Sequence, residues 1–303
     1  MKILLLAPVF SFLFGASGYC ADYRKGADAY NEGNYEVALE EWRPLAERGD
    51  ARAQFSVGIM HAHGRGVPQS YEEAARWYRL AGEQGNARAQ NNLGTMYELG
   101  EGVAENYEEA VKWYRLAAEQ GEAKAQVNLG SMYDLAKGVA RDYAEAARWY
   151  RLAAGRGEAK AQANLGSMYA FGKGVARDYE EAARWYRLAG EQGNTKAQIE
   201  LGFMYEFGRG VSRDDREAAR WYRLAAGRGN AKAQLNLGSM YAFGKGVPED
   251  YVYAHMWYSI SASLGNKMAD KRMEQIEKIM SPSQIEKAEE LAKECMGKNY
   301  KNC

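Results

Sequence analysis

The residues best suited to catalysis or metal binding are few, and their spacing does not form a site. The only histidines are His61, His63 and His255. Two zinc ligands on one helix are normally three or four residues apart, whereas His61 and His63 are two apart with no cysteine nearby. We therefore expect these histidines to have surface or packing roles. The sequence predicts no metal site and no cofactor.

A glycine-rich stretch from Gly166 to Lys173 superficially resembles a phosphate-binding loop. It has one residue too many between its glycines, and Gly174 stands where serine or threonine is required. The same stretch recurs near Gly238 to Lys245, so it belongs to a repeated pattern. No Ser-x-x-Lys motif occurs either, so the serine β-lactamase arrangement is missing. We predict a protein without a catalytic site.

The composition narrows the function classes further. Lys plus Arg and Asp plus Glu both number 40, so the formal net charge is zero. Nucleic-acid binding usually leaves a basic excess, which argues against that class of partner. The chain has 33 glycines but only 5 prolines, which suits helices that end at glycine. The chain has 303 residues, more than a domain with a single hydrophobic core usually contains, so it must divide into domains or repeats.

The N-terminus has the features of a secretory signal peptide. Lys2 precedes an apolar run over residues 3–14, and small residues follow at 15–18. Cleavage could fall after Gly18 or after Ala21, and the sequence does not decide between these two sites. The alternative to a cleaved signal peptide is an N-terminal membrane anchor. We expect an exported protein, periplasmic or secreted, with no membrane span once the signal is removed. In an oxidising compartment Cys295 and Cys303 could form a disulfide, the alternative being two free thiols.

A repeat of 36 residues is the strongest pattern in the sequence. Six tryptophans share this spacing, and a tyrosine follows each one: Trp77, Trp113, Trp149, Trp185, Trp221 and Trp257. A fixed period in this range predicts stacked structural units. The domain organisation predicted is a signal peptide at 1–21, a degenerate unit at 22–50, six repeats over 51–266 and a helical cap at 267–303. In the degenerate unit Trp42 aligns with Tyr78, and Glu41 takes the place of the tryptophan.

Each repeat should contain two antiparallel helices, which gives an all-α fold. In the copy at 159–194, helical spacing places these residues on the buried face of the first helix: Ala161, Leu165, Met168 and Tyr169. On the second helix the expected buried residues are Ala182, Trp185, Leu188 and Ala189. Gly166 should allow close helix packing, and Gly172 with Gly174 should turn the chain. Asp178 and Glu181 fit a capping box at the start of the second helix.

These motifs resemble the Sel-1-like repeat family, relatives of the tetratricopeptide repeat. The matching segments are Ala-x-Ala-Gln-x-x-Leu-Gly-x-Met-Tyr, Gly-x-Gly-Val, Asp-Tyr-x-x-Ala and Trp-Tyr-x-x-Ala-Ala-x-x-Gly, and the resemblance covers about residues 22–266. It implies a right-handed superhelical solenoid of antiparallel helix pairs with a concave face. It also implies an adaptor or scaffold role, often in bacterial secreted proteins. One departure is Ala136, which replaces the first turn glycine, so we expect that turn to differ.

The positions that vary between copies indicate where a partner would bind, because the constant ones are needed for stacking. A face of each first helix carries a basic residue near its start, followed by variable positions. By analogy with tetratricopeptide proteins this face lines the concave groove, and it gives these candidate partner-binding residues: Arg88, Asn91, Lys124, Lys160, Lys196, Ile199, Phe203 and Lys232. The basic row could bind acidic groups, and Ile199 with Phe203 could anchor an apolar side chain. The alternative for the basic row is that these residues are only solvated side chains at the start of each helix, with no partner to bind.

The function predicted is a non-enzymatic scaffold that binds a protein or peptide as a monomer. A cell-wall-related or β-lactam-hydrolysing enzyme remains the main alternative, because some Sel-1-like proteins have been described as penicillin-binding. A structural spacer or toxin-like secreted factor is the third hypothesis.

Overall fold

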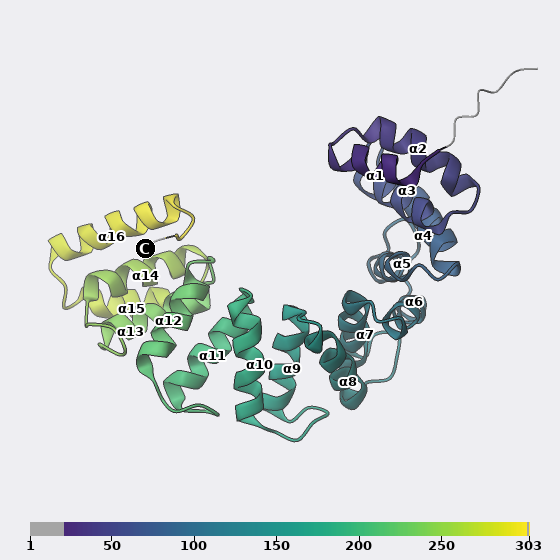
Figure 1. Cartoon of the computed structure of the whole chain (residues 1–303). Helices are drawn as coiled ribbons and strands as arrows, with labels where there is room; N and C mark the ends of the chain where they lie inside the picture. Colours follow the sequence, from purple (N-terminus) through teal and green to yellow (C-terminus); the bar gives the residue numbers. More distant parts are fainter. Residues whose placement is uncertain (1–20, 302) are drawn as a thin grey trace, which may run out of the picture. The chain divides into compact units, whose positions relative to one another are not determined.

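The computed structural model describes residues 21–301 and 303, which form α-helices joined by short turns, with no strand among them (Figure 1). The all-α prediction is confirmed. Within the described residues no helix is both long and apolar enough to cross a membrane. The predicted signal peptide falls on residues 1–21, of which the structure describes only Ala21.

The chain divides into two compact units. The first unit ends at Glu105 and contains α1 (Tyr23–Asn31), α2 (Tyr35–Glu47), α3 (Ala51–His63), α4 (Tyr71–Glu83) and α5 (Ala87–Leu99). From α2 to α5 each helix packs on the one before it. The boundary between the units falls in a turn inside the second repeat, between its two helices.

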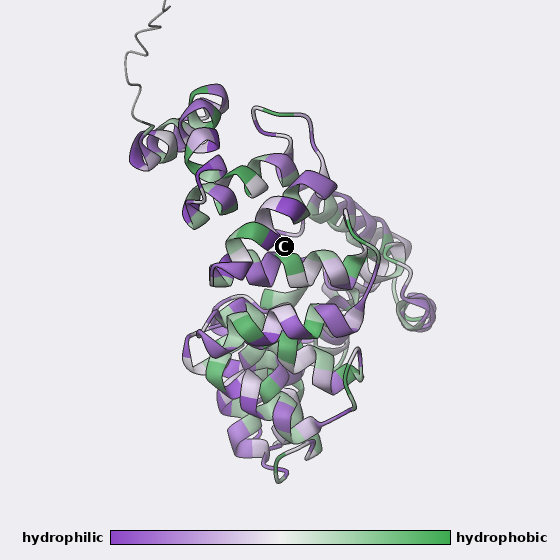
Figure 2. Ribbon diagram, turned by 90° about the vertical axis from the view of Figure 1, so that its right-hand side faces the viewer, coloured by the Kyte–Doolittle hydropathy of each residue, from purple (hydrophilic) through white to green (hydrophobic). Residues whose placement is uncertain are grey.

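The second unit comprises residues 106–303. Its helices are α6 (Tyr107–Glu119), α7 (Ala123–Leu135), α8 (Tyr143–Gly155), α9 (Ala159–Phe171), α10 (Tyr179–Glu191), α11 (Thr195–Phe207), α12 (Asp215–Ala226), α13 (Ala231–Ala242), α14 (Tyr251–Ser263), α15 (Lys267–Glu277) and α16 (Pro282–Gly297). From α7 to α15 each helix packs on its predecessor, so helix pairs follow one another in tandem. Polar and apolar residues are mixed along each helix, as expected when one face packs and the other meets water (Figure 2).

Three successive helices share each stretch of core. One core cluster combines Val127 of α7, Tyr150 of α8 and Leu165 of α9. A solenoid is built this way because a single helix pair cannot bury its apolar face alone. In the copy at 159–194, Ala161, Leu165 and Met168 are buried as predicted.

The prediction for the second helix needs a correction. Leu188 of α10 is 45% exposed, and Tyr186 is buried in its place at 1%. Trp185 is only partly buried, against the core of the preceding helices. The sequence pattern identified an apolar stripe, but which side of that stripe faced a neighbouring helix depended on the packing angle.

The glycine inside the first helix makes room for this tyrosine. A Cβ on Gly166 would lie 2.8 Å from Cδ1 of Tyr186, closer than any real contact. The same relation holds between Gly130 and Tyr150, and between Gly202 and Tyr222. The predicted packing role of Gly166 is therefore confirmed, and its partner is the repeated tyrosine.

The two turn glycines have the left-handed backbone conformation that favours glycine, with φ of 66° at Gly172 and 67° at Gly174. Ala136 takes the first position in the third repeat with φ of 58°, and α7 still ends one residue before it. The expectation that this turn would differ was wrong. The surrounding turn holds the alanine in the same conformation at a cost in backbone energy.

The helix caps agree with the prediction in part. Asp178 accepts hydrogen bonds from the backbone N–H groups of Glu180 and Glu181, which starts α10. The Glu181 carboxylate, however, pairs with Arg184 at 2.6 Å, so the reciprocal half of the expected capping box is absent. Among the described helices the complete capping box is that of Ser281 and Gln284, at the start of α16.

A glutamine on each first helix fastens it to the helix before. Gln162 is buried, and its Nε2 donates to the carbonyl oxygen of Ala154 at the end of α8. Gln126, Gln198 and Gln234 make the equivalent bond to Ala118, Gly190 and Ala226. These bonds use carbonyl groups that have no partner within their own helix.

The first helix pair is the degenerate unit. Trp42 is buried and packs over Gly26, as Tyr78 packs over Gly58 in the next repeat. Glu41 is 1% exposed, where it pairs with Lys25 at 2.6 Å and accepts from the Asp22 backbone N–H. The substitution of tyrosine by Trp42 is therefore compatible with the repeat.

The C-terminal helices cover the last repeat. Helix α15 packs on α14, and α16 packs across α14 as well (Figure 1). Cys295 of α16 is bonded to Cys303, with an S–S distance of 2.03 Å. The disulfide closes the chain end back onto α16.

Candidate functional site

The basic residues predicted on the first helices are all exposed. They are the second residue of successive first helices, and the described set is Arg52, Arg88, Lys124, Lys160, Lys196 and Lys232. Arg52 pairs with Asp50 at 3.2 Å. Within the described part of the second unit, Lys124, Lys160, Lys196 and Lys232 have no ion pair.

This placement is unfavourable for the helices themselves. The N-terminus of a helix carries a partial positive charge, so a cation in the first turn loses about 0.3–1 kcal/mol relative to a favourable end. Nothing in the structure offsets this cost for the four lysines of the second unit. Their repetition is therefore not explained by helix stability.

The neighbouring predicted positions are less accessible. Ile199 is 6% exposed and packs in the core formed by α11, α12 and α13, so it offers almost no surface to a partner. Asn91 is also buried, at 8%. The helix-face argument placed these residues beside the lysines, but the approach of the next helix covers them.

Phe203 is half-buried and packs on its own helix and turn. Its ring centroid lies 4.5 Å from that of Phe207, and the Arg209 guanidinium lies 5.0 Å from the Phe203 ring. It borders a cavity of about 70 Å³ with Tyr186 and Glu200. Phe203 therefore forms a wall of this cavity.

The same cavity occurs three repeats earlier, in the first unit, where Thr95 holds the position of Phe203. It has a volume of about 340 Å³ and its walls include Tyr78, Asn92 and Met96. Both cavities are lined by the repeated tyrosine and by the side chain at the position of Asn92, together with other polar residues. The cavity is smaller where Phe203 replaces the smaller Thr95.

A polar row missed by the sequence analysis runs beside the lysines. Asparagine occurs four residues after the basic residue in four repeats, at Asn92, Asn128, Asn164 and Asn236, and Glu200 replaces it in the fifth. Each asparagine lies near the buried tyrosine of the preceding repeat: Asn92 near Tyr78, Asn164 near Tyr150 and Asn236 near Tyr222. The sequence analysis assigned residues that are constant between repeats to the stacking of the repeats. The asparagines were therefore not considered as candidate binding residues. The signal in the sequence is a polar residue that recurs at one position of the first helix, and its partial exposure is evident only in the structure.

The tyrosine hydroxyls of this row are held in a desolvated environment. Burial raises the pKa of Tyr78 and of Tyr150 to about 12. Burial also raises the pKa of Tyr222, and the nearby Glu206 carboxylate, which accepts its hydroxyl at 2.9 Å, raises it further. These hydroxyls stay protonated at neutral pH and act as hydrogen-bond donors and acceptors, with no role as a base.

The histidines do not form a reactive site. His255 is buried, and its Nε2 lies 2.8 Å from the Glu277 carboxylate. Burial lowers the pKa of His61. The described residues contain no group of three or more His, Cys, Asp and Glu side chains that could hold a metal ion.

The geometry is that of a helical-repeat scaffold, in which tandem helix pairs present a repeated surface. The sequence matches the family described as Sel1 repeat at 51–86, 87–122, 123–158, 159–194, 195–230 and 231–266. The chain therefore belongs to the Sel1 repeat family, as its motifs indicated. A comparison with curated proteins found no match.

Two solved structures are similar to the chain over most of its length. One is c5321, described as a protective antigen of uropathogenic Escherichia coli with an SLR fold, at 40% identity and a TM-score of 0.78. The match covers 86% of this chain but 56% of that protein, so this chain spans little more than half of its length. The other is a Sel1 repeat protein from Oxalobacter formigenes, at 35% identity and a TM-score of 0.72, with 80% of this chain and 100% of that one covered.

Proposed function

We propose that this protein is a non-enzymatic scaffold that binds a protein or peptide on the face of its first helices. The observation that carries the proposal is the row of exposed, unpaired lysines on α7, α9, α11 and α13. Four cations at equivalent positions present a regular series of positive charges to a ligand. A partner with acidic side chains spaced to match would bind with favourable electrostatics.

The asparagine row supports a peptide as the ligand. An amide side chain carries both a donor and an acceptor, which matches the N–H and C=O groups of a peptide backbone. Asn164 and Asn236 each lie near a buried tyrosine and are partly exposed. The asparagines would hydrogen-bond to the backbone of an extended acidic segment, and the lysines would bind its acidic side chains.

We propose further that the protein acts in the periplasm or outside the cell as a monomer. The N-terminal sequence has signal-peptide features, and the Cys295–Cys303 disulfide is compatible with an oxidising compartment. The binding role itself does not depend on this location.

The test is cross-linking in the native envelope followed by mass spectrometry, with two charge-reversal variants compared with the natural chain. The first variant changes the lysine row to glutamate at Lys124, Lys160, Lys196 and Lys232. The matched control reverses exposed second-helix cations that already pair with glutamates, at Lys112, Arg148 and Arg184.

We expect partners that cross-link to the natural chain and to the control to be lost from the lysine-row variant. Equal capture by all three proteins would exclude the first-helix face as the binding surface. Retention by the lysine-row variant alone would place the surface on the second helices.

A further inference from the structure

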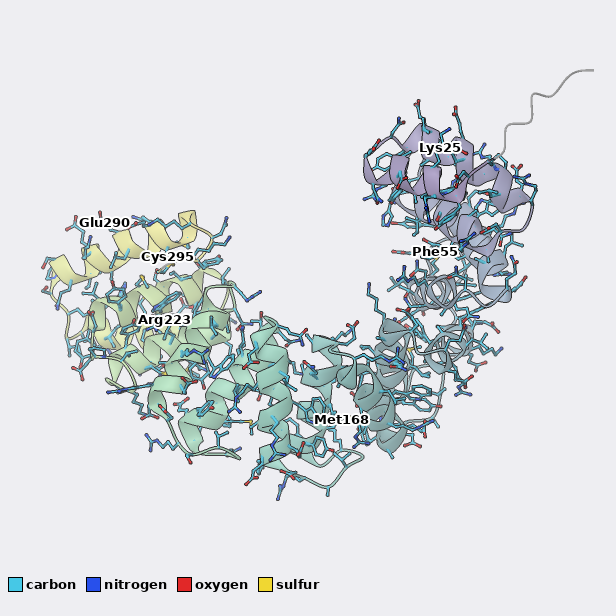
Figure 3. The ribbon with its side chains drawn as sticks, in the orientation of Figure 1. Lys25, Phe55, Met168, Arg223, Glu290 and Cys295 are labelled. Atoms are coloured by element: carbon cyan, nitrogen blue, oxygen red, sulfur yellow. A yellow bond between two sulfur atoms is a disulfide. The ribbon has the colours of Figure 1, made fainter. Side chains whose placement is uncertain are left out.

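A basic pocket lies at the C-terminal end of the second unit, and no lysine of the row is among the residues that line it. It has a volume of about 600 Å³, within the range of ligand sites in proteins. Its walls come from α12 and the turn after it, from α14 and from the chain end: Arg220, Arg223, Leu224, Gly227, Arg228, Trp257, Tyr300, Lys301 and Cys303. Arg223 and Cys295 are labelled in this part of the molecule in Figure 3.

The charged side chains that line the pocket are all positive. Three arginines and Lys301 line it, and no acidic side chain does. Arg220 is paired with Glu217 at 3.0 Å, and Arg223 donates to the Tyr241 hydroxyl, which leaves its charge uncompensated. Among the described residues, Arg228 and Lys301 have no ion pair, and the Arg228 guanidinium lies against Gly193 of the preceding repeat. The pocket therefore has a net positive potential at neutral pH.

Apolar side chains stand between these cations. Leu224 is 43% exposed, and Tyr300 is partly buried. Above the buried Trp257 they give the pocket an apolar surface within reach of the arginines. A ligand that fits this surface must carry both negative charge and an apolar group.

The chain end forms one wall, and the sequence of the fifth repeat makes room for it. The ring of Tyr300 lies against Gly229, where a Cβ would be 2.9 Å from Cε2. The carbonyl of Tyr300 approaches Gly227, at 3.3 Å from the position of a Cβ. The disulfide to Cys295 and the hydrogen bond from the Tyr300 N–H to the Cys295 carbonyl hold this segment in place.

The third repeat carries the same residues without the wall. The sequence Trp-Tyr-Arg-Leu-Ala-Ala-Gly-Arg-Gly occurs at 149–157 and again at 221–229. In the third repeat nothing lies within 4 Å of a Cβ on Gly155 or Gly157, and Arg156 donates to the Gly121 carbonyl at 2.6 Å. Of the two identical segments, the one at 221–229 thus has the C-terminal segment packed beside it, and the one at 149–157 has no such wall.

We propose that this pocket is a second recognition site, which binds an acidic peptide segment with an aliphatic or aromatic side chain next to its carboxylates. Arginine binds carboxylates through two parallel hydrogen bonds, and Leu224 and Tyr300 provide the apolar contact. Because the site lies on the second helices and the chain end, it can be occupied independently of the first-helix face. The protein would then hold two partners, or two segments of one partner.

The probe for the test is a labelled peptide, Glu-Glu-Leu-Phe-Glu-Glu, with binding measured by fluorescence anisotropy on the full chain. We expect saturable binding that Arg228→Ala weakens about tenfold, which corresponds to about 1.4 kcal/mol. Arg156→Ala is the matched control, because it removes the same residue of the same motif where no wall exists. It should leave the affinity unchanged.

Two more sets of variants test whether the chain end, and not the lysine row, supplies the binding surface for this probe. Cys303→Ser releases the wall from the disulfide and should weaken binding to a similar degree. Lys196→Ala and Lys232→Ala measure any binding of the acidic probe on the first-helix face. A loss of binding in these two variants with none in Arg228→Ala would overturn this proposal and leave the first-helix proposal standing.

Equal losses in Arg228→Ala and Arg156→Ala would overturn the proposal, as would an absence of saturable binding. A probe with Gly-Ser in place of Leu-Phe should bind more weakly. Equal binding of that probe, or of inorganic pyrophosphate, would show that the pocket attracts anions without recognising a peptide.

Discussion

Two turn glycines of the fourth repeat allow a direct test of what holds successive repeats together. Gly172 and Gly174 have nearly the same backbone conformation, with φ of 66° and 67°. Their surroundings differ. A Cβ on Gly172 would meet the Arg177 Cβ at 3.3 Å, whereas a Cβ on Gly174 would lie 2.0 Å from the carbonyl oxygen of Tyr143 in the preceding repeat.

The magnitudes follow from these distances. An alanine in the left-handed conformation costs about 1–2 kcal/mol, and the lower entropy of the unfolded chain returns about 0.4–1 kcal/mol. Gly172→Ala should therefore lower the free energy of unfolding by about 1 kcal/mol. Gly174→Ala has the same backbone cost, and the overlap with Tyr143 adds about 1–3 kcal/mol or more.

The assay is urea unfolding of each variant by circular dichroism, combined with hydrogen exchange of the backbone near Tyr143. We expect Gly174→Ala to be the less stable variant by about 1–3 kcal/mol. It should also speed exchange at the start of α8, because the added methyl group pushes the third and fourth repeats apart. Gly172→Ala should leave exchange in α8 unchanged.

Equal losses of stability in the two variants would refute the reasoning, since the backbone conformation alone would then account for both. Faster exchange in α8 with Gly172→Ala would refute it as well. In either case the close approach of the turn to Tyr143 would not be what fixes the stacking.

Two further predictions concern the same elements. Ala136→Gly should raise the free energy of unfolding by about 0.5–1 kcal/mol in the urea assay, because glycine removes the energetic penalty of alanine in the left-handed conformation. The larger entropy of the unfolded chain offsets only part of that gain. A loss of stability in this variant would contradict the prediction. The free energy of unfolding should fall as pH rises from 10 to 12. The pKa of the buried Tyr78 and Tyr150 is about 12 in the folded chain and 10.0 in the unfolded chain, so the folded chain binds these protons more tightly. Tyrosinate absorbance during alkaline titration measures this, and Tyr150→Phe should reduce the alkaline loss.

The period of the sequence predicted the helices because the signals for them are local. Six tryptophans at a fixed interval identified the units, and the glycines and aspartates between them marked where helices end and begin. The alignment of Trp42 with Tyr78 was also correct, since both rings pack over a helix glycine. Such signals need only the chain within one repeat.

The binding surface was predicted less well, because burial on a solenoid depends on the neighbouring repeat. The lysines were placed on an exposed face, but Ile199 beside them is covered by the following helices. Leu188 was expected to be buried and is exposed. Helical periodicity defines the faces of one helix and does not say which of two adjacent faces meets the next helix.

The sequence by itself determined that this protein is a tandem array of helix pairs with a charged residue at the start of each first helix. Only the tertiary structure decided that constant asparagines lie partly exposed beside buried tyrosines, and that the second turn glycine touches the preceding repeat. It also decided that one of two identical motifs, at 221–229, faces the chain end and forms a pocket, while that at 149–157 does not. The physical reason is that stacking and pocket formation depend on contacts between residues far apart in the chain. A repeat pattern does not predict which of these residues meet.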